Sequence, residues 1–212
     1  MDLQNLRMEY AERPISVESV DPDPFKQFES WFSEATNAKI HEPNAMVLAT
    51  VTQSQPAQRT VLLKLFDASG FVFFTNYNSR KASHIKENNQ VSLLFPWYPL
   101  HRQVEITGAV EKVSTAESIK YFALRPRGSQ LGAWVSEQSS VVSSRSLLQN
   151  KLAEFRQKFA SGSVPKPPAW GGFRVTPSRF EFWQGGRDRL HDRIEYLPEA
   201  ESQSWSRRRL AP

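Results

Sequence analysis

The chain has 212 residues, 39% hydrophobic and 12% aromatic, which is enough for one domain with a sizeable core. It has no cysteine, which excludes disulfides, thiolate metal sites and a cysteine nucleophile, and no apolar run approaches the roughly 20 residues of a membrane helix. The polar N-terminus is unlike a signal peptide, so we expect a cytoplasmic protein. The net charge of +5 leaves a nucleic-acid-binding module open, although only Arg207–Arg209 forms a basic run, which we interpret as a solvated terminal strand.

The first elements are a helical segment and a strand. Residues 1–20 are polar and predict a short helix and loop, in which Arg7 and Tyr10 share one face. The segment DPDPFKQFESWFSEATN predicts an amphipathic helix that packs on the core, with Asp23 as its N-cap. AMVLATVT, residues 45–52, predicts the first strand.

Residues 59–81, RTVLLKLFDASGFVFFTNYNSRK, predict a β-hairpin with DASG as its turn. On this register Phe66 faces Phe71. Counting back along the ladder places Arg59 level with Asn78, at the open end of the hairpin.

A helix is predicted next at RKASHIKEN, with Ser79 as N-cap and Arg80 and Lys81 in its first turn. Cations are unfavourable at the positive end of a helix dipole unless an anion lies among them. Together with Arg59, these residues predict a phosphate pocket. The alternative is that the basic residues only guard the ends of an aggregation-prone hairpin.

Two further antiparallel strands are predicted at QVSLLFPWY and RQVEITGAVEKV. Pro96 marks an edge or a bulge in the first, because proline cannot donate a hydrogen bond to a ladder. Gln103 lies on the second strand.

STAE is a capping box that opens a helix through Tyr121 to about Leu124. Tyr121 and Arg125 are four residues apart and share a face, and Ser129 follows, so this segment is a second candidate anion site. A tyrosine and an arginine that merely snorkel at a helix end are an equally open alternative. Residues 136–146 are rich in hydroxyl groups and suit either a flexible loop or one that hydrogen-bonds a polar ligand. The helix SLLQNKLAEFRQKFA and a proline-rich connector come next.

The last third predicts strands at FRVTP, SRFEFWQ and GGRDRLHDRIEYL, with Gly185–Gly186 as a tight hairpin connection. In an extended strand, Arg189, His191 and Arg193 lie on one face. Two arginines that flank a histidine repel each other, so the row predicts an anionic or electron-rich ligand, with His191 able to exchange a proton near neutral pH. A solvated face with acidic partners from elsewhere is the alternative.

These motifs, in their order along the chain, resemble the pyridoxamine 5'-phosphate oxidase family. The matching segments are RTVLLK, FFTN, SRK, LLFPW, RQVE, RPRGSQLGAW, EQSS, WGGFRV, EFWQGG, RLHDR and the final RRLAP. The resemblance runs from about residue 45 onward, and RMEY is similar to the family's substrate-gating segment. It implies a mainly antiparallel β fold with helices: an FMN-binding split β-barrel flanked by helices, as a single domain over residues 21–212, preceded by a gating segment at residues 1–20.

The resemblance also implies a homodimer with FMN at the subunit interface. The residues implied to bind FMN are Arg59, Thr60, Val61, Leu62, Leu63, Lys64, Phe74, Thr75, Arg80, Lys81, Gln103, Gln138, Ser139, Trp183 and Arg193. Those implied to bind the substrate are Arg7, Tyr10, Lys64, Tyr121, Arg125, Ser129, Arg189, Leu190 and His191. Of these, Arg189 and His191 are implied to be catalytic, and no metal is implied.

The implied activity is oxidation of pyridoxamine 5'-phosphate and pyridoxine 5'-phosphate to pyridoxal 5'-phosphate. A hydride passes from the carbon that bears the amine or alcohol to the flavin, and oxygen then reoxidises the flavin with formation of hydrogen peroxide. The amine substrate also releases ammonia. Partners are thus the two substrates, oxygen and a second copy, with neither nucleic acid nor membrane; the alternative is a split-barrel FMN-binding protein with a different reductase or binding role.

Three positions depart from the expected pattern. Arg59 and Lys64 are five residues apart, so a regular strand places them on opposite faces, and a bulge, a strong twist or contacts with two ligands is required. Phe74 replaces a tyrosine of some relatives, so a contact there comes from backbone or ring. Glu42 stands where an aspartate is expected, which argues against a catalytic role for it.

Overall fold

The computed structural model describes residues 10, 13–200 and 204–212. Arg7 and most of the segment 1–20 therefore lie outside the described residues, and the helix and the gating role predicted there stay predictions. Within the described part, no helix is long and apolar enough to cross a membrane, and no group of three or more His, Asp or Glu side chains is placed to hold a metal ion.

The described residues form one sheet of nine antiparallel strands with helices around it, which confirms the predicted fold class. The strands are β1 (Ala45–Thr52), β2 (Gln55–Leu62), β3 (Leu65–Asp67), β4 (Gly70–Asn76), β5 (Gln90–Trp97), β6 (Arg102–Lys112), β7 (Trp170–Gln184), β8 (Asp192–Pro198) and β9 (Trp205–Leu210). The helices are α1 (Pro24–Asn37), α2 (Arg80–Glu87), α3 (Thr115–Leu124), α4 (Arg127–Val135), α5 (Arg145–Lys158) and the 3₁₀ turns η1 (Tyr98–Leu100) and η2 (Arg187–Arg189).

The sheet curls upon itself without closing. Its strand order is β2-β1-β5-β6-β7-β4-β3, with β8 paired to β7 and β9 to β8. Only Leu63 and Lys64 separate β2 from β3, although these strands stand at opposite ends of that order. The ends of the sheet are therefore brought together, and the Lys64 N–H donates to the Val72 carbonyl of β4 at 2.9 Å.

The predicted hairpin from Arg59 to Asn78 is wrong in part. Phe66 does face Phe71 across β3 and β4. However, β2 pairs with β1, and Arg59 lies opposite Leu48. The reason is the two-residue turn before β2: Gln53 and Ser54 both have positive φ, 46° and 61°, as in the turn that joins two twisted strands most tightly.

The break after β2 also removes the conflict between Arg59 and Lys64. Because Leu62 ends β2 and Lys64 lies outside any strand, the alternation of a regular strand does not apply between them. Leu63 turns into the core with 5% of its surface exposed, while Arg59 and Lys64 both line one cavity.

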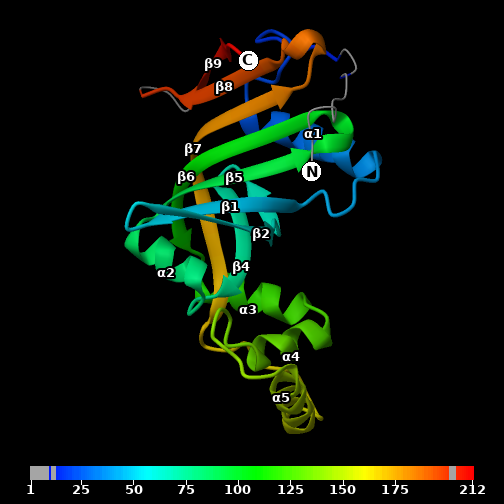
Figure 1. Ribbon diagram of the computed structural model, residues 1–212, viewed down its shortest axis with the longest axis vertical. Helices are drawn as coiled ribbons and strands as arrows, with labels where there is room; N and C mark the ends of the chain where they lie inside the picture. Colours follow the sequence, from blue (N-terminus) through cyan, green and yellow to red (C-terminus); the bar gives the residue numbers. More distant parts are fainter. Residues whose placement is uncertain (1–9, 11–12, 201–203) are drawn as a thin grey trace, which may run out of the picture.

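Strand β7 runs along the length of the molecule, from the helices α3–α5 at one end to β8 and β9 at the other (Figure 1). Its first half pairs with β4, its second half with β8, and β6 pairs with nearly all of it. We predicted two strands here, which is wrong. The register shifts beside Gly108, which lies opposite Pro177, and this bulge accommodates the proline. A Cβ on Gly108 would lie 2.1 Å from the Thr176 carbonyl oxygen, so only glycine fits.

Helix α1 fills the inside of the curl. The Asp23 side chain accepts from the Phe25 N–H at 2.9 Å, as predicted for its N-cap. Phe28 is fully buried, with its ring centroid 4.9 Å from those of Phe71 and Phe95. The α1 stripe is therefore core, as the sequence indicated.

The predicted capping box of α3 and the predicted start of α2 after Ser79 are both confirmed. Helix α4 was not predicted, because Pro126 reads as a helix stop. Pro126 follows directly after the C-cap of α3, Arg125, and is itself the N-cap of α4.

Candidate active site

A cavity of about 780 Å³ opens between β2, β4, α3 and α4. The predicted site residues that line it are Arg59, Thr60, Val61, Leu62, Lys64, Phe74, Thr75, Lys81, Tyr121, Arg125, Ser129 and Gln138. The lining residues that were not predicted are Asn76, Leu124, Pro126, Gly132, Ala133, Ser136 and Trp170. The described lining includes four cations and no acidic side chain, so the cavity favours an anion.

Lys81, in the first turn of α2, is 9% exposed. Its ammonium donates to Thr75 Oγ1 at 3.1 Å and to Gln138 Oε1 at 3.0 Å. Burial, and then the charge of Arg59, lowers the pKa of Lys81. The recorded partners of the ammonium are neutral, so an anion in the cavity would supply the missing charge.

Arg59 and Arg80 complete the first basic cluster. Burial, and then the charge of Arg80, lowers the pKa of Arg59, which places the two guanidinium groups within electrostatic reach. The Arg80 N–H donates to Ser139 Oγ at 3.2 Å. Arg80 and Ser139 line a second cavity of about 690 Å³, which shares four lining residues with the first: Asn76, Ala133, Ser136 and Gln138. The predicted gathering of three cations is therefore present, although the hairpin expected to cause it is not.

The second basic cluster consists of Lys64, Tyr121, Arg125 and Ser129, and its centre is the end of α3. Arg125 stacks over the Trp170 ring at 4.7 Å, and burial lowers its pKa. Burial also raises the pKa of Tyr121, against the opposing effect of Arg125. The Arg125 Nη1 atom is buried without a hydrogen-bond partner among the described residues. An unpaired buried guanidinium nitrogen is costly, so this atom indicates a place for an acceptor.

An aromatic stack forms one wall of the cavity. The Phe74 ring lies 4.0 Å from that of Tyr121 and 5.3 Å from that of Trp170, nearly parallel to both. The Phe74 ring therefore forms part of the cavity wall, and its predicted ligand contact through backbone or ring stays a prediction. Trp170 was not among the predicted site residues, because the sequence marks it only as an aromatic residue before Gly171–Gly172 at the start of a strand.

The other residues predicted for FMN lie in a row at the far end of the sheet. Gln103, Trp183 and Arg193 are direct cross-strand neighbours on β6, β7 and β8. Trp170 and Trp183 stand near opposite ends of β7, roughly 40 Å apart along the strand. These three residues therefore do not reach the cavity of their own chain.

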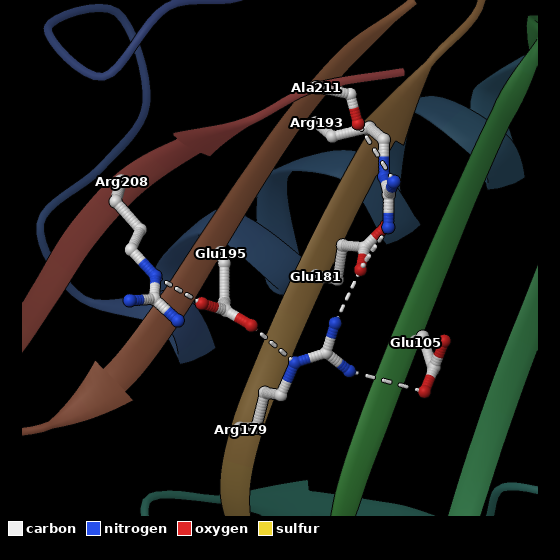
Figure 2. Close-up of polar contacts among 7 residues, drawn as sticks. All are labelled: Glu105, Arg179, Glu181, Arg193, Glu195, Arg208 and Ala211. Atoms are coloured by element: carbon white, nitrogen blue, oxygen red, sulfur yellow. Dashed lines mark hydrogen bonds and ion pairs between the residues drawn. The ribbon is translucent and has the colours of Figure 1, made fainter.

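An ion-pair network fixes this end of the sheet (Figure 2). Arg179 contacts three carboxylates, those of Glu105, Glu181 and Glu195. Glu181 also accepts two hydrogen bonds from Arg193, from Nε at 2.8 Å and from Nη2 at 3.0 Å. Hydrogen bonds from the arginines lower the pKa of Glu195 against the effect of burial. The basic run in β9 takes part in this network, because Arg208 forms an ion pair with Glu195. The prediction of a merely solvated strand is therefore wrong.

The predicted strand with Arg189, His191 and Arg193 on one face is wrong. Asp188 and Arg189 have positive φ, 52° and 65°, within η2, and β8 begins only at Asp192. Gly185–Gly186 thus opens a longer loop, in place of the tight hairpin that we predicted. The Gly186 N–H donates to His191 Nδ1 at 3.1 Å. Leu190 is 72% exposed.

His191 belongs to an aromatic cluster with Trp183 and Tyr10. Its ring centroid lies 4.7 Å from that of Trp183 and 5.6 Å from that of Tyr10. Tyr10 also contacts His101, at 4.6 Å, which the sequence did not single out. Burial, and then Arg189, lowers the pKa of His191, which favours its neutral form. Glu42, in contrast, is exposed in a turn near His41 and does not line the cavity.

Fold and cavity together define a curled, open antiparallel sheet with a basic, aromatic-lined site suited to a phosphorylated ring compound. The chain belongs to the pyridoxamine 5'-phosphate oxidase family. The family model described as pyridoxamine 5'-phosphate oxidase matches residues 32–159, and one described as pyridoxine 5'-phosphate oxidase C-terminal dimerisation region matches residues 170–212.

Similar proteins agree over the full length. The chain is 57% identical to a pyridoxine/pyridoxamine 5'-phosphate oxidase of Aliarcobacter butzleri and 58% identical to one of Crocosphaera subtropica, each over 100% of both chains. Among solved structures, PhzG from Burkholderia lata, in complex with tetrahydrophenazine-1-carboxylic acid, is 26% identical with a TM-score of 0.89, over 97% of this chain and 100% of that one. An FMN-binding protein from Nostoc punctiforme shares the fold at 16% identity and a TM-score of 0.71, over 91% and 100%. The split-barrel fold implied by the sequence is thereby confirmed.

Proposed function

We propose that this protein oxidises pyridoxamine 5'-phosphate and pyridoxine 5'-phosphate to pyridoxal 5'-phosphate with FMN as cofactor. Family membership supports the reaction, and one structural observation supports the substrate class. The buried Arg125 Nη1 has no partner among the described residues and belongs to a cavity without acidic lining. A phosphate oxygen is the acceptor that a guanidinium in such a place suits best.

The donor set of the first basic cluster fits the FMN phosphate. Arg59, Arg80 and Lys81 supply charge, and the hydroxyls of Thr75 and Ser139 supply neutral hydrogen-bonding groups, all near the N-terminus of α2. A phosphate there would offset the mutual repulsion of the cations and interact with the positive end of the helix dipole.

The second cluster fits the substrate phosphate. Lys64, Arg125, Tyr121 and Ser129 line the same cavity, so both phosphates would enter one continuous space. The Phe74 stack lies beside them and limits where a flat ring can lie. Two anchored phosphates would hold the two rings in a reactive arrangement.

A second copy of the chain would complete the site. Trp183 lies too far along β7 to reach the cavity of its own chain, and so do its cross-strand neighbours Gln103 and Arg193. The matched C-terminal region carries a family description as a dimerisation region. We therefore infer a homodimer in which this row, and the loop with Arg189, Leu190 and His191, contact the ligands of the partner's cavity.

When bound, FMN supplies hydride acceptance and reaction with oxygen, which yields hydrogen peroxide. The chain's own residues bind and orient the substrate. Arg189 would hold the substrate ring and stabilise negative charge on it. His191 Nδ1 accepts a hydrogen bond from Gly186, and its pKa is lowered by burial, so the neutral ring carries its proton on Nε2 and can donate from there.

The test is an oxidase assay on the purified protein with each substrate, with and without added FMN, following pyridoxal 5'-phosphate and peroxide. We expect a yellow protein that produces both. Arg189→Leu and His191→Asn should lose most turnover yet keep FMN. A colourless protein that binds RNA or DNA in a salt-sensitive way would instead support a nucleic-acid-binding module, and a yellow but inactive one a different flavoprotein.

A cytoplasmic location is part of the same proposal. It is supported by the absence of cysteine from the sequence, which suits a reducing compartment.

A further inference from the structure

Arg59 is held from behind by strand β1. Its Nη1 atom donates to the Leu48 carbonyl at 3.0 Å and to Thr50 Oγ1 at 2.7 Å. These two bonds use both protons of Nη1. The Arg59 guanidinium makes no other hydrogen bond among the described residues, so its Nε and Nη2 atoms are free to bind a ligand in the cavity.

Thr50 is completely buried and connects Arg59 to a histidine. Its Oγ1 lies 3.1 Å from His84 Nδ1 and 3.4 Å from the Ala57 carbonyl. Burial, and then Arg59 and Arg80, lowers the pKa of His84, so its ring is neutral near pH 7. The Thr50–His84 contact has two arrangements, set by the imidazole tautomer: Thr50 donates to Nδ1, or Nδ1 donates to Thr50 and the hydroxyl donates to the Ala57 carbonyl. In both arrangements a lone pair of Oγ1 accepts from Arg59.

His84 lies in α2, the helix whose first turn carries Arg80 and Lys81. The contacts Arg59–Thr50–His84 thus connect β2, through β1, to the helix that carries the other two cations. We propose that Thr50 and His84 are positioning residues for the FMN phosphate, because they aim the free edge of the Arg59 guanidinium into the cavity. This inference rests on the proposed function.

Packing alone does not require a hydroxyl at position 50. Valine has nearly the same shape and brings no polar group that must be satisfied in the interior. A buried hydroxyl that accepts from a charged group at 2.7 Å, in contrast, fixes that group's direction. Thr50 is therefore expected to matter for the phosphate more than for the fold.

The test compares FMN with riboflavin, which lacks the phosphate, by quenching of flavin fluorescence on titration with the full-length chain. For Thr50→Val we expect FMN affinity to fall about tenfold, as for the loss of one hydrogen bond to a charged group, and riboflavin affinity to stay within about twofold. Thr50→Ser keeps the hydroxyl and should keep FMN affinity. The matched control is Thr52→Val on the same strand, whose hydroxyl bonds Glu87 and not Arg59.

His84 provides a second, independent readout. His84→Leu should weaken FMN binding by about threefold, because the Thr50 hydroxyl then loses the side-chain contact that helps to fix its orientation toward Arg59. His84→Asn, whose amide can donate to or accept from the Thr50 hydroxyl, should keep the affinity of the unmodified chain. In a Thr50→Val background His84→Leu should have no further effect, whereas residues that only support the fold independently would give additive losses.

Two failures are distinguishable. If the unmodified chain binds FMN no more tightly than riboflavin, the proposed phosphate site itself is wrong. If it prefers FMN and Thr50→Val leaves that preference unchanged, or lowers both affinities equally, the positioning role is overturned. An unfolding curve for each variant confirms that the protein titrated is folded.

Discussion

Arg193 and Glu181 form a two-pronged ion pair across β8 and β7, with Nε 2.8 Å from Oε1 and Nη2 3.0 Å from Oε2. The Glu181 side chain is only 5% exposed. The third guanidinium nitrogen of Arg193, Nη1, donates to the Ala211 carbonyl at 2.9 Å (Figure 2). One buried carboxylate therefore orients an arginine that we propose for the FMN site and attaches the segment after β9 to the sheet.

Glu181→Gln should lower the free energy of unfolding by about 3 kcal/mol, because the loss of this buried carboxylate leaves Arg193 without its acidic partner and removes one of the three carboxylates around Arg179. It should also weaken FMN binding through Arg193. Glu105→Gln is the control: Glu105 contacts Arg179 from a half-buried position, where an ion pair contributes about 1 kcal/mol or less. Urea unfolding and flavin titration check both; equal stability of the two variants would contradict the role given to Glu181.

Arg125→Met should raise KM for the phosphorylated substrate about 100-fold, since a charged hydrogen-bonding partner of the phosphate is lost. Stability should change little, because the stacking lost over Trp170 is offset by the removal of a buried nitrogen that has no hydrogen-bond partner among the described residues. Arg127→Met offers the opposite pattern. Its guanidinium donates to the Gly162 and Phe159 carbonyls, so stability should fall by about 1 kcal/mol with KM unchanged. Steady-state kinetics and unfolding curves separate the two, and a shared rise in KM would count against the phosphate site.

Lys81→Met should make the ligand-free protein more stable and remove most of the stabilisation that FMN gives. Burial and Arg59 both disfavour the charged form of Lys81, so a neutral side chain of similar length relieves this strain. Lys86→Met, at an exposed position of the same helix, should change neither property. Thermal unfolding with and without FMN is the measurement. A Lys81→Met protein that FMN stabilises as much as the unmodified one would refute the assignment.

The ligand-free protein should lose stability as pH falls below 6.5. The pKa values of His84 and His191 are both lowered from 6.5, chiefly by burial. Below 6.5 the unfolded chain therefore binds more protons than the folded one, so this contribution to stability is complete above 6.5 and is lost through the folded pKa values. Replacing His84 with Leu should flatten the slope, whereas His41→Gln, at a 94% exposed site, should not. Urea unfolding at several pH values decides this, and identical slopes in all three proteins would contradict it.

Local patterns determined much of this structure from the sequence alone. The Asp23 cap, the Ser114 capping box and the Phe66–Phe71 register are each set by residues a few positions apart, where side-chain chemistry acts directly on the backbone. The basic residues at the start of α2 were also visible in the sequence, because cations at the N-terminal end of a helix oppose its dipole. Arg125, at the C-terminal end of α3, gave no such signal, since the dipole favours a cation there.

Only the tertiary structure decided which residues meet. Arg59 joins Thr50 because a two-residue turn pairs β2 with β1, and Arg59 and Lys64 share a cavity because the chain breaks after Leu62 and the sheet curls. Trp183 and Arg193 are separated from that cavity by the length of β7, although the sequence groups them with it. The spacing of apolar residues and the distribution of charge indicate which secondary structure each segment prefers. Contacts between distant segments depend on sheet curvature and strand order, which these local preferences do not encode.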